Sequence, residues 1–230
     1  MNTEEGIVLL VNKPLEWTSF DVVNKLRYIL HTRKIGHAGT LDPLATGLLI
    51  ICAGKMTKQI DTFQAQEKEY TGTLVLGQTT PSYDLETEPT TAVDTAGITP
   101  TQVKQAAQAF VGNIEQVPPA HSSIKVGGKR AYDMARKGKA VELKPRAVEV
   151  REFEITNCRF PEVDFRVVCS KGTYIRSLAH DLGQKLGVGA YLSSLCRTRI
   201  GSFTLDQAET LEQIQRRFAD QPLPVQPQDP

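Results

Sequence analysis

Apolar and polar positions follow two rhythms along this chain, one typical of strands and one of helices. Short apolar runs predict buried strands over 7–11 and 48–53, and alternation predicts another over 70–76. Two further strands are predicted over 147–158 and 163–170, joined by a turn at 160–162. Apolar residues three and four apart predict helices over 174–186 and 206–218.

Two helix starts carry their own capping signals. Thr18 or Ser19 is expected to cap a helix that turns Phe20, Val23, Leu26 and Leu30 inward. Thr99-Pro100-Thr101 is expected to open another helix, since proline suits the first helical turn. Short helices are also predicted over 132–137 and, as a helix or turn, over 191–199. Strands and helices mix without a regular β–α–β rhythm, which favours the α+β class.

Composition narrows the class of protein. With 230 residues, 40% of them hydrophobic, the chain can bury one large core, and we expect one domain over 1–218 followed by a disordered proline-rich tail over 219–230. The four cysteines are scattered and form no CxxC pair, which argues against a zinc site and a disulfide framework. No segment reads as a signal peptide or a membrane span, so we expect a cytoplasmic protein.

Charge is unevenly distributed although the net charge is only +1. Residues 121–151 hold nine Lys or Arg against three acids, and residues 165–202 hold six against one. Separate basic segments of this kind can converge on a polyanion such as nucleic acid, or they can be ordinary solvated surface. Charge alone leaves both interpretations open.

The run Gly36-His37-Ala38-Gly39-Thr40-Leu41-Asp42-Pro43-Leu44-Ala45-Thr46-Gly47 is the strongest candidate site. It is too rich in Gly and Pro for a plain helix or strand, and its leucines tie it to a core. A carboxylate held on such a loop can act as nucleophile, general base or electrostatic stabiliser, or it can simply cap a turn. No second acid lies nearby, which argues against a glycosidase pair.

A second candidate is Ser170-Lys171-Gly172-Thr173-Tyr174-Ile175-Arg176, which leads from a strand into a helix. Arg176 can pair with a carboxylate or phosphate, and pairing with Asp42 would keep that acid ionised in an apolar pocket; it can also be an ordinary surface arginine. Tyr70, which follows Lys68-Glu69, offers an aromatic face for a nucleobase or is simply packed. His37 can contact a base or phosphate, or bond within its turn.

These segments, in this order, resemble the TruB-type tRNA pseudouridine synthases. The resemblance includes Lys13-Pro14, the Asp42 run, Lys68-Glu69-Tyr70, Gln116-Val117-Pro118-Pro119 with Ser122 and Lys125, the segment 170–176, and 195–198, and it covers about 7–211. It implies an α+β pseudouridine synthase fold, a long mixed sheet flanked by helices with a central catalytic cleft. The implied reaction isomerises uridine 55 in the T loop of tRNA to pseudouridine, with no cofactor and no metal.

The resemblance also implies roles for individual residues. Asp42 would be the catalytic aspartate, and Arg176 would pair with it. Tyr70 would stack on the flipped base, and His37, Tyr174 and Leu195 would hold or replace the nucleotide. The expected RNA contacts are the basic residues Lys13, Lys125, Lys129, Arg130, Lys171 and Arg197. The expected partner is the T arm of tRNA, bound by a monomer.

Some positions depart from the family pattern. The chain ends at Pro230, so we expect no C-terminal PUA-type domain and weaker binding of the acceptor end. His121 and Cys196 stand where aromatic and arginine residues are usual. A role for Asp84 is only loosely indicated. Two alternatives remain: a non-catalytic RNA-binding protein that assists tRNA folding, and a nucleoside hydrolase with an aspartate nucleophile.

Overall fold

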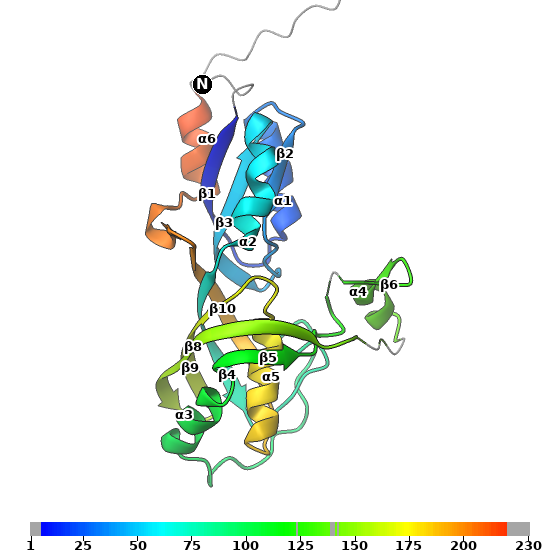
Figure 1. Ribbon diagram of the computed structural model, residues 1–230, viewed down its shortest axis with the longest axis vertical. Helices are drawn as coiled ribbons and strands as arrows, with labels where there is room; N and C mark the ends of the chain where they lie inside the picture. Colours follow the sequence, from blue (N-terminus) through cyan, green and yellow to red (C-terminus); the bar gives the residue numbers. More distant parts are fainter. Residues whose placement is uncertain (1–5, 123, 139–140, 142, 220–230) are drawn as a thin grey trace, which may run out of the picture. The chain divides into compact units, whose positions relative to one another are not determined.

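The computed structural model describes residues 6–122, 124–138, 141 and 143–219, which form two compact units. Unit 1 comprises the chain up to Gln66 and from Arg197 onward, and unit 2 comprises Glu67–Cys196. The fold class is α+β, as predicted: a mixed sheet flanked by helices (Figure 1). None of the described helices is long and apolar enough to cross a membrane. The predicted tail lies outside the described residues apart from Ala219, which still belongs to the last helix.

Unit 1 is a small sheet with α-helices packed on both of its faces. Its elements are β1 (Ile7–Lys13), α1 (Ser19–Ile29), β2 (Ile35–Ala38), β3 (Ala45–Ala53), the 3-10 helix η1 (Gly54–Gln59), α2 (Ile60–Ala65), β11 (Phe203–Thr204), the 3-10 helix η2 (Leu205–Gln207) and α6 (Leu211–Ala219). Both β1 and β2 pair antiparallel with β3, so β3 is the central strand of this unit.

The continuous apolar run of β3 is explained by cover on both faces of the strand. Leu49 and Ile51 pack with α1 and α6, whereas Leu48 and Ile50 pack with residues of α2 and the β11 region. Successive residues of a strand point to opposite faces, so a strand covered twice needs apolar residues at every position. Figure 1 shows α1, α2 and α6 alongside β1–β3.

Unit 2 is built on an antiparallel sheet in the order β4-β9-β8-β5. Its elements are β4 (Lys68–Leu76), α3 (Pro100–Gln108), β5 (Gly112–Gln116), β6 (Lys125–Val126), β7 (Lys129–Arg130), α4 (Ala131–Ala135), β8 (Arg146–Arg159), β9 (Glu162–Cys169) and α5 (Ile175–Lys185). The strand β10 (Ala190–Ile200) then passes from unit 2 into unit 1.

The two faces of the unit 2 sheet differ in chemistry. One face buries Phe153 and Phe165, whose rings meet edge-on at 5.9 Å. The other face carries ion pairs across the strands, including Arg166 with Glu69 at 2.7 Å. This alternation confirms the strands predicted over 147–158 and 163–170.

Several predicted elements need correction. Residues 191–199 belong to the strand β10 and do not form a helix or turn, and Tyr191 and Leu192 are buried in it. Phe20, predicted to face inward, is exposed, and Val22 takes the buried place. The last helix begins at Leu211 rather than at residue 206, since 205–207 form a separate 3-10 turn. Parts of the predicted 36–47 loop belong to β2 and β3.

Candidate active site

Asp42 lies in a short connection between β2 and β3, in unit 1. Its own carbonyl accepts from the Ala45 backbone N–H at 3.1 Å, which closes a turn at Pro43 and Leu44. Gly39, at the start of the connection, has φ +87°, a conformation that residues with a side chain rarely adopt. We call residues 39–44 the Asp42 loop.

The buried side chain of Arg197 bonds the backbone at the start of this loop and in β3. It is 1% exposed, and its Nε donates to the Leu48 carbonyl at 2.8 Å while Nη2 donates to the Gly39 carbonyl at 3.0 Å. The predicted role of Arg197 as an RNA contact is therefore wrong in this structure. A buried guanidinium bonded to two carbonyls instead fixes where the loop leaves β2 and where β3 continues.

Lys13, the last residue of β1, bonds the same loop at Pro43. Its ammonium donates to the carbonyls of Pro14, Trp17 and Pro43 at 2.8, 2.6 and 3.2 Å. An ammonium group has three donors, and all three are used here. The side chain is 0% exposed, so the predicted RNA contact of Lys13 is wrong as well. Lys13 instead holds three backbone carbonyls together.

A third attachment comes from the first residue of α1. The Ser19 hydroxyl accepts from the Leu41 N–H at 2.8 Å and donates to the Leu41 carbonyl at 3.1 Å. The Glu16 N–H adds a bond to the Pro43 carbonyl at 2.8 Å. The backbone on both sides of Asp42 is thus bonded to β1, α1 and β10, which leaves the partly buried Asp42 on a loop with little freedom.

The electrostatics of this region reflect the burial of cations. Burial lowers the pKa of Lys13 from 10.5 to about 8, the negative charge of Asp42 acts in the opposite direction, and Arg197 adds to the lowering. Burial also lowers the pKa of His37, and the positive charge of Arg197 acts in the same sense. His37 is a residue of β2, opposite Ile51, and favours its neutral form.

In unit 2, Arg176 is buried rather than on the surface, in the first turn of α5. It is 4% exposed, its Nη1 donates to the Ser82 carbonyl at 3.1 Å, and its Nη2 donates to the His121 carbonyl at 2.9 Å. Its Nε lies 3.6 Å from Oδ2 of Asp84, which is buried as well. The loosely indicated Asp84 therefore belongs to the surroundings of Arg176.

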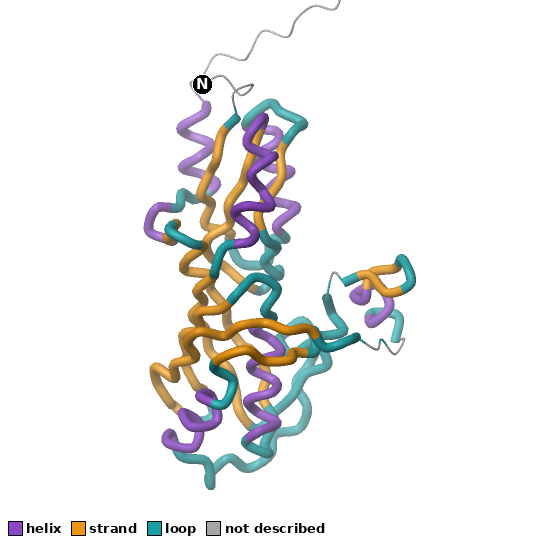
Figure 2. Tube along the Cα trace, viewed as in Figure 1, coloured by secondary structure: helices purple, strands orange, loops and turns teal. Residues whose placement is uncertain are grey.

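The segment that supplies Ser82 and Asp84 is the long loop between β4 and α3. Tyr83 has a positive φ of 65°, and its ring stacks on His180 at 3.9 Å with 15° between the planes. The Tyr83 carbonyl accepts from the Leu192 N–H at 2.9 Å. Figure 2 shows this loop running alongside α5. Within this loop Thr80, Ser82 and Asp84 are buried.

Tyr174 occupies the N-cap position of the same helix, and its backbone is bonded by Gln116. Gln116 accepts from the Tyr174 N–H at 2.8 Å and donates to its carbonyl at 3.0 Å. The Arg146 guanidinium lies 5.4 Å from the centre of the Tyr174 ring. Gln116 is the last residue of β5, a strand that the sequence did not predict, so neither its position nor its partner was foreseen.

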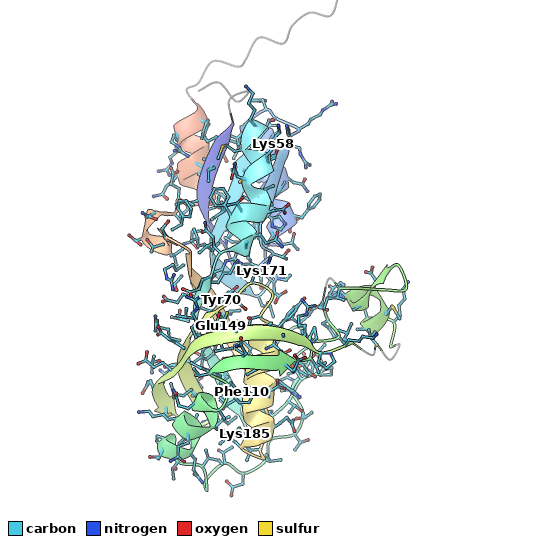
Figure 3. The ribbon with its side chains drawn as sticks, viewed as in Figure 1. Lys58, Tyr70, Phe110, Glu149, Lys171 and Lys185 are labelled. Atoms are coloured by element: carbon cyan, nitrogen blue, oxygen red, sulfur yellow. The ribbon has the colours of Figure 1, made fainter. Side chains whose placement is uncertain are left out.

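The remaining predicted residues of unit 2 are distributed over its strands and loops. Tyr70 is largely buried on β4 opposite Val167, and Lys171 is exposed in the turn between β9 and α5. In Figure 3, Tyr70 and Lys171 lie toward the end of α5 where the helix begins, and Lys185 lies at the other end. Leu195 is partly buried in β10.

The basic arm over 121–138 is described in part. The side chains of Lys125, Lys129 and Arg130 lie outside the described structure, so their predicted RNA contacts stay predictions. The Arg136 guanidinium lies 4.4 Å from the centre of the Tyr132 ring and pairs with Glu86 at 3.0 Å. The Glu86 N–H in turn donates to Asp84 at 3.0 Å, which links the arm to the surroundings of Arg176.

Comparison with known proteins identifies the family. The model of the TruB family pseudouridylate synthase N-terminal domain matches residues 27–175, and that of the tRNA pseudouridylate synthase B C-terminal domain matches 176–223. The chain belongs to the TruB family of pseudouridylate synthases. TruB-family enzymes are isomerases, which confirms the enzyme class predicted from the sequence. The predicted α+β pseudouridine synthase fold is confirmed as well.

Two relatives in this family share about half of their aligned residues with this chain. The chain is 54% identical over 218 residues to tRNA pseudouridine synthase B of Phocaeicola vulgatus, with 92% of this chain and 93% of that protein covered. The corresponding protein of Thermobifida fusca is 47% identical, with 94% of this chain and 76% of that protein covered. Among solved structures, a Cbf5–Nop10–Gar1 complex matches with TM-score 0.72 and 32% identity over 92% of this chain. The chain spans about half, 54%, of that solved chain.

Proposed function

We propose that this chain isomerises uridine 55 in the T loop of tRNA to pseudouridine, with Asp42 as the catalytic carboxylate. Family membership and relatives named tRNA pseudouridine synthase B support the reaction and the tRNA substrate. The assignment to uridine 55 rests on the resemblance of the motifs. The observation that carries the role of Asp42 is the density of backbone bonds around it, because preorganised groups contribute most to catalysis.

The reaction rearranges one nucleotide without net change in atoms. The C1′–N1 bond breaks, the freed uracil turns, and C5 bonds to C1′; the C5 proton leaves and N1 gains one. Asp42 either attacks C1′ or promotes cleavage of the glycosidic bond. In this proposal Tyr70 stacks on the base, and His37, Tyr174 and Leu195 hold the nucleotide or take its place. The pairing of Arg176 with Asp42 stays a prediction.

A uridine within a folded loop must be extruded before its glycosidic bond is accessible. Extrusion costs a few kcal/mol, which stacking on aromatic side chains and contacts to phosphates can offset. Lys171 is an exposed cation suited to a phosphate contact. The proposal thus needs no group beyond the side chains of this chain.

The decisive experiment replaces the carboxylate alone. Asp42→Asn is expected to lower pseudouridine formation at least about 10³-fold, because the amide is neither nucleophile nor base. Formation is measured by release of tritium from tRNA labelled at C5 of uridine. Affinity for the T arm is expected to stay within about threefold of wild type, since Asn keeps the size of Asp and the loop bonds are made by backbone groups. The matched control is Asp61→Asn, an exposed acid on α2 of the same unit, with unchanged activity.

Three results would contradict the proposal. Full activity of Asp42→Asn would remove the carboxylate from the reaction. Free uracil, detected by chromatography, would indicate the hydrolase alternative. Tight RNA binding by the wild type without any pseudouridine would indicate the RNA-binding alternative.

A further inference from the structure

The helix α1 exposes an aromatic and basic face that the proposed chemistry does not use. Phe20 is 60% exposed and Tyr28 is 77% exposed, whereas Val22, Val23 and Leu26 fill the buried face of the same helix. Single exposed apolar residues are common, but two aromatic rings two turns apart on one helix are not explained by packing.

Polar and cationic groups join these rings into a continuous stripe. The Arg27 guanidinium lies 6.0 Å from the centre of the Phe20 ring, and its Nη1 donates to Asn24 at 2.6 Å. The Tyr28 ring lies 6.2 Å from that of His31. We call Phe20, Asn24, Arg27, Tyr28 and His31 the α1 stripe.

The charge around the stripe is positive. Arg33 and Lys34, both exposed, follow the helix directly. The one acid on α1, Asp21, is engaged by the Thr18 N–H and hydroxyl at 2.9 and 2.6 Å. Lys25 interacts with Glu212 of α6 and is therefore left out of the stripe.

The stripe begins where the Asp42 loop is anchored. Ser19, which bonds both backbone groups of Leu41, is the neighbour of Phe20. Since α1 has 11 residues, the stripe runs about 16 Å away from the anchor. A nucleic acid with one nucleotide at Asp42 has its flanking nucleotides within reach of such a surface.

We propose that the α1 stripe is a docking surface for the RNA that flanks the reactive uridine, which rests on the proposed function. Phe20 and Tyr28 stack on unpaired bases, and Arg27, with the basic turn after the helix, contacts phosphates. Aromatic faces interleaved with cations are the recurring means of binding unpaired nucleotides. The exposed cations Arg33 and Lys34 beside the stripe favour a polyanion over a protein as the occupant, since lysine is depleted in protein–protein interfaces.

The test compares single substitutions in binding and in turnover. Phe20→Ala and Tyr28→Ala are each expected to raise the Kd for a tRNA transcript about 5- to 100-fold, measured by fluorescence anisotropy. Arg27→Gln is expected to reduce the salt slope of the affinity by about one, while the wild-type affinity falls steeply with salt. The value of kcat at saturating tRNA is expected to stay near wild type, because these contacts are equal in ground and transition states.

Matched controls remove equally exposed groups elsewhere. Val93→Ser replaces a 53% exposed apolar residue, and Lys185→Gln removes an exposed cation at the far end of α5 from Arg176. Both are expected to leave Kd and salt slope unchanged. Unfolding midpoints of all variants establish that the fold is intact.

Unchanged Kd and salt slope in the three α1 variants, with a wild type that forms pseudouridine, would overturn the docking surface and leave the proposed function standing. Intact RNA affinity combined with a changed association state in light scattering would assign the stripe to a protein partner and overturn it as well. Weaker RNA binding by these variants, in a wild type that forms no pseudouridine, would support the surface and reject the proposed function instead.

Discussion

Buried arginines serve opposite purposes in the two units. In unit 1, Arg197 is the support, and it bonds the backbone of Gly39 in the Asp42 loop and of Leu48 in β3. In unit 2, Arg176 is itself the supported object, held by the Ser82 and His121 carbonyls and by Asp84. A buried cation can therefore hold a loop in place, and loops can equally hold a buried cation in place.

The largest effects are expected when each guanidinium is removed. Arg176→Met is expected to lower the free energy of unfolding by about 3–5 kcal/mol, because it takes a cation from the buried Asp84. Arg197→Met is expected to lower it by about 2–4 kcal/mol, since two carbonyls lose their donor. Urea denaturation measures both values.

A second substitution distinguishes the loss of a charge partner at Arg176 from the loss of a hydrogen-bond donor at Arg197. Asp84→Asn is expected to recover part of the loss in the Arg176→Met background, because it removes the uncompensated charge, and to recover nothing in the Arg197→Met background. Equal recovery in both backgrounds would show that the two arginines are supported alike and that the comparison is wrong.

A smaller effect is expected from the titration of Lys13. Its pKa is about 8 in the folded chain and 10.5 in the unfolded chain, so between these values the unfolded state binds more protons. Stability conferred at this site therefore rises with pH from about 8 to 10.5 and is constant below 8, with at most about 3 kcal/mol in the whole change. Lys13→Met is expected to lack this rise when urea denaturation is repeated across the range. If the free energy of unfolding changed with pH in the same way in the wild type and in Lys13→Met, the lowered pKa of Lys13 would be refuted.

The smallest effect concerns the stack of Tyr83 on His180. His180→Ala is expected to cost about 1 kcal/mol, in line with a single aromatic pair, and His180→Phe is expected to restore most of it. Burial lowers the pKa of His180, so its contribution is present above the ordinary value of 6.5 and is lost as the pH falls through the lower folded value. Both His180 variants are expected not to lose this stability at acid pH. Thermal unfolding at several pH values measures the difference. An unchanged pH profile in His180→Ala would contradict this assignment.

The sequence alone determined the elements whose signals are local. Thr18, one of the two predicted caps of α1, forms a capping box, and so does Thr99 at the start of α3, where Pro100 lies in the first turn as predicted. Such signals are readable because a side chain caps the backbone only three residues away. The motif around Asp42 identified the family for a similar reason, since its residues are contiguous.

Features that depend on partners far away in the chain could not be predicted from the sequence. Residues 191–199 became a strand, and Phe20 turned to solvent, because burial depends on what packs against each residue and not on its spacing in the chain. Lys13 and Arg197 look like surface cations in sequence, yet each bonds carbonyls contributed by other segments, at Pro43 and at Gly39. A carbonyl acceptor has no sequence signature, since every residue carries one, and so these buried cations could be found only in three dimensions.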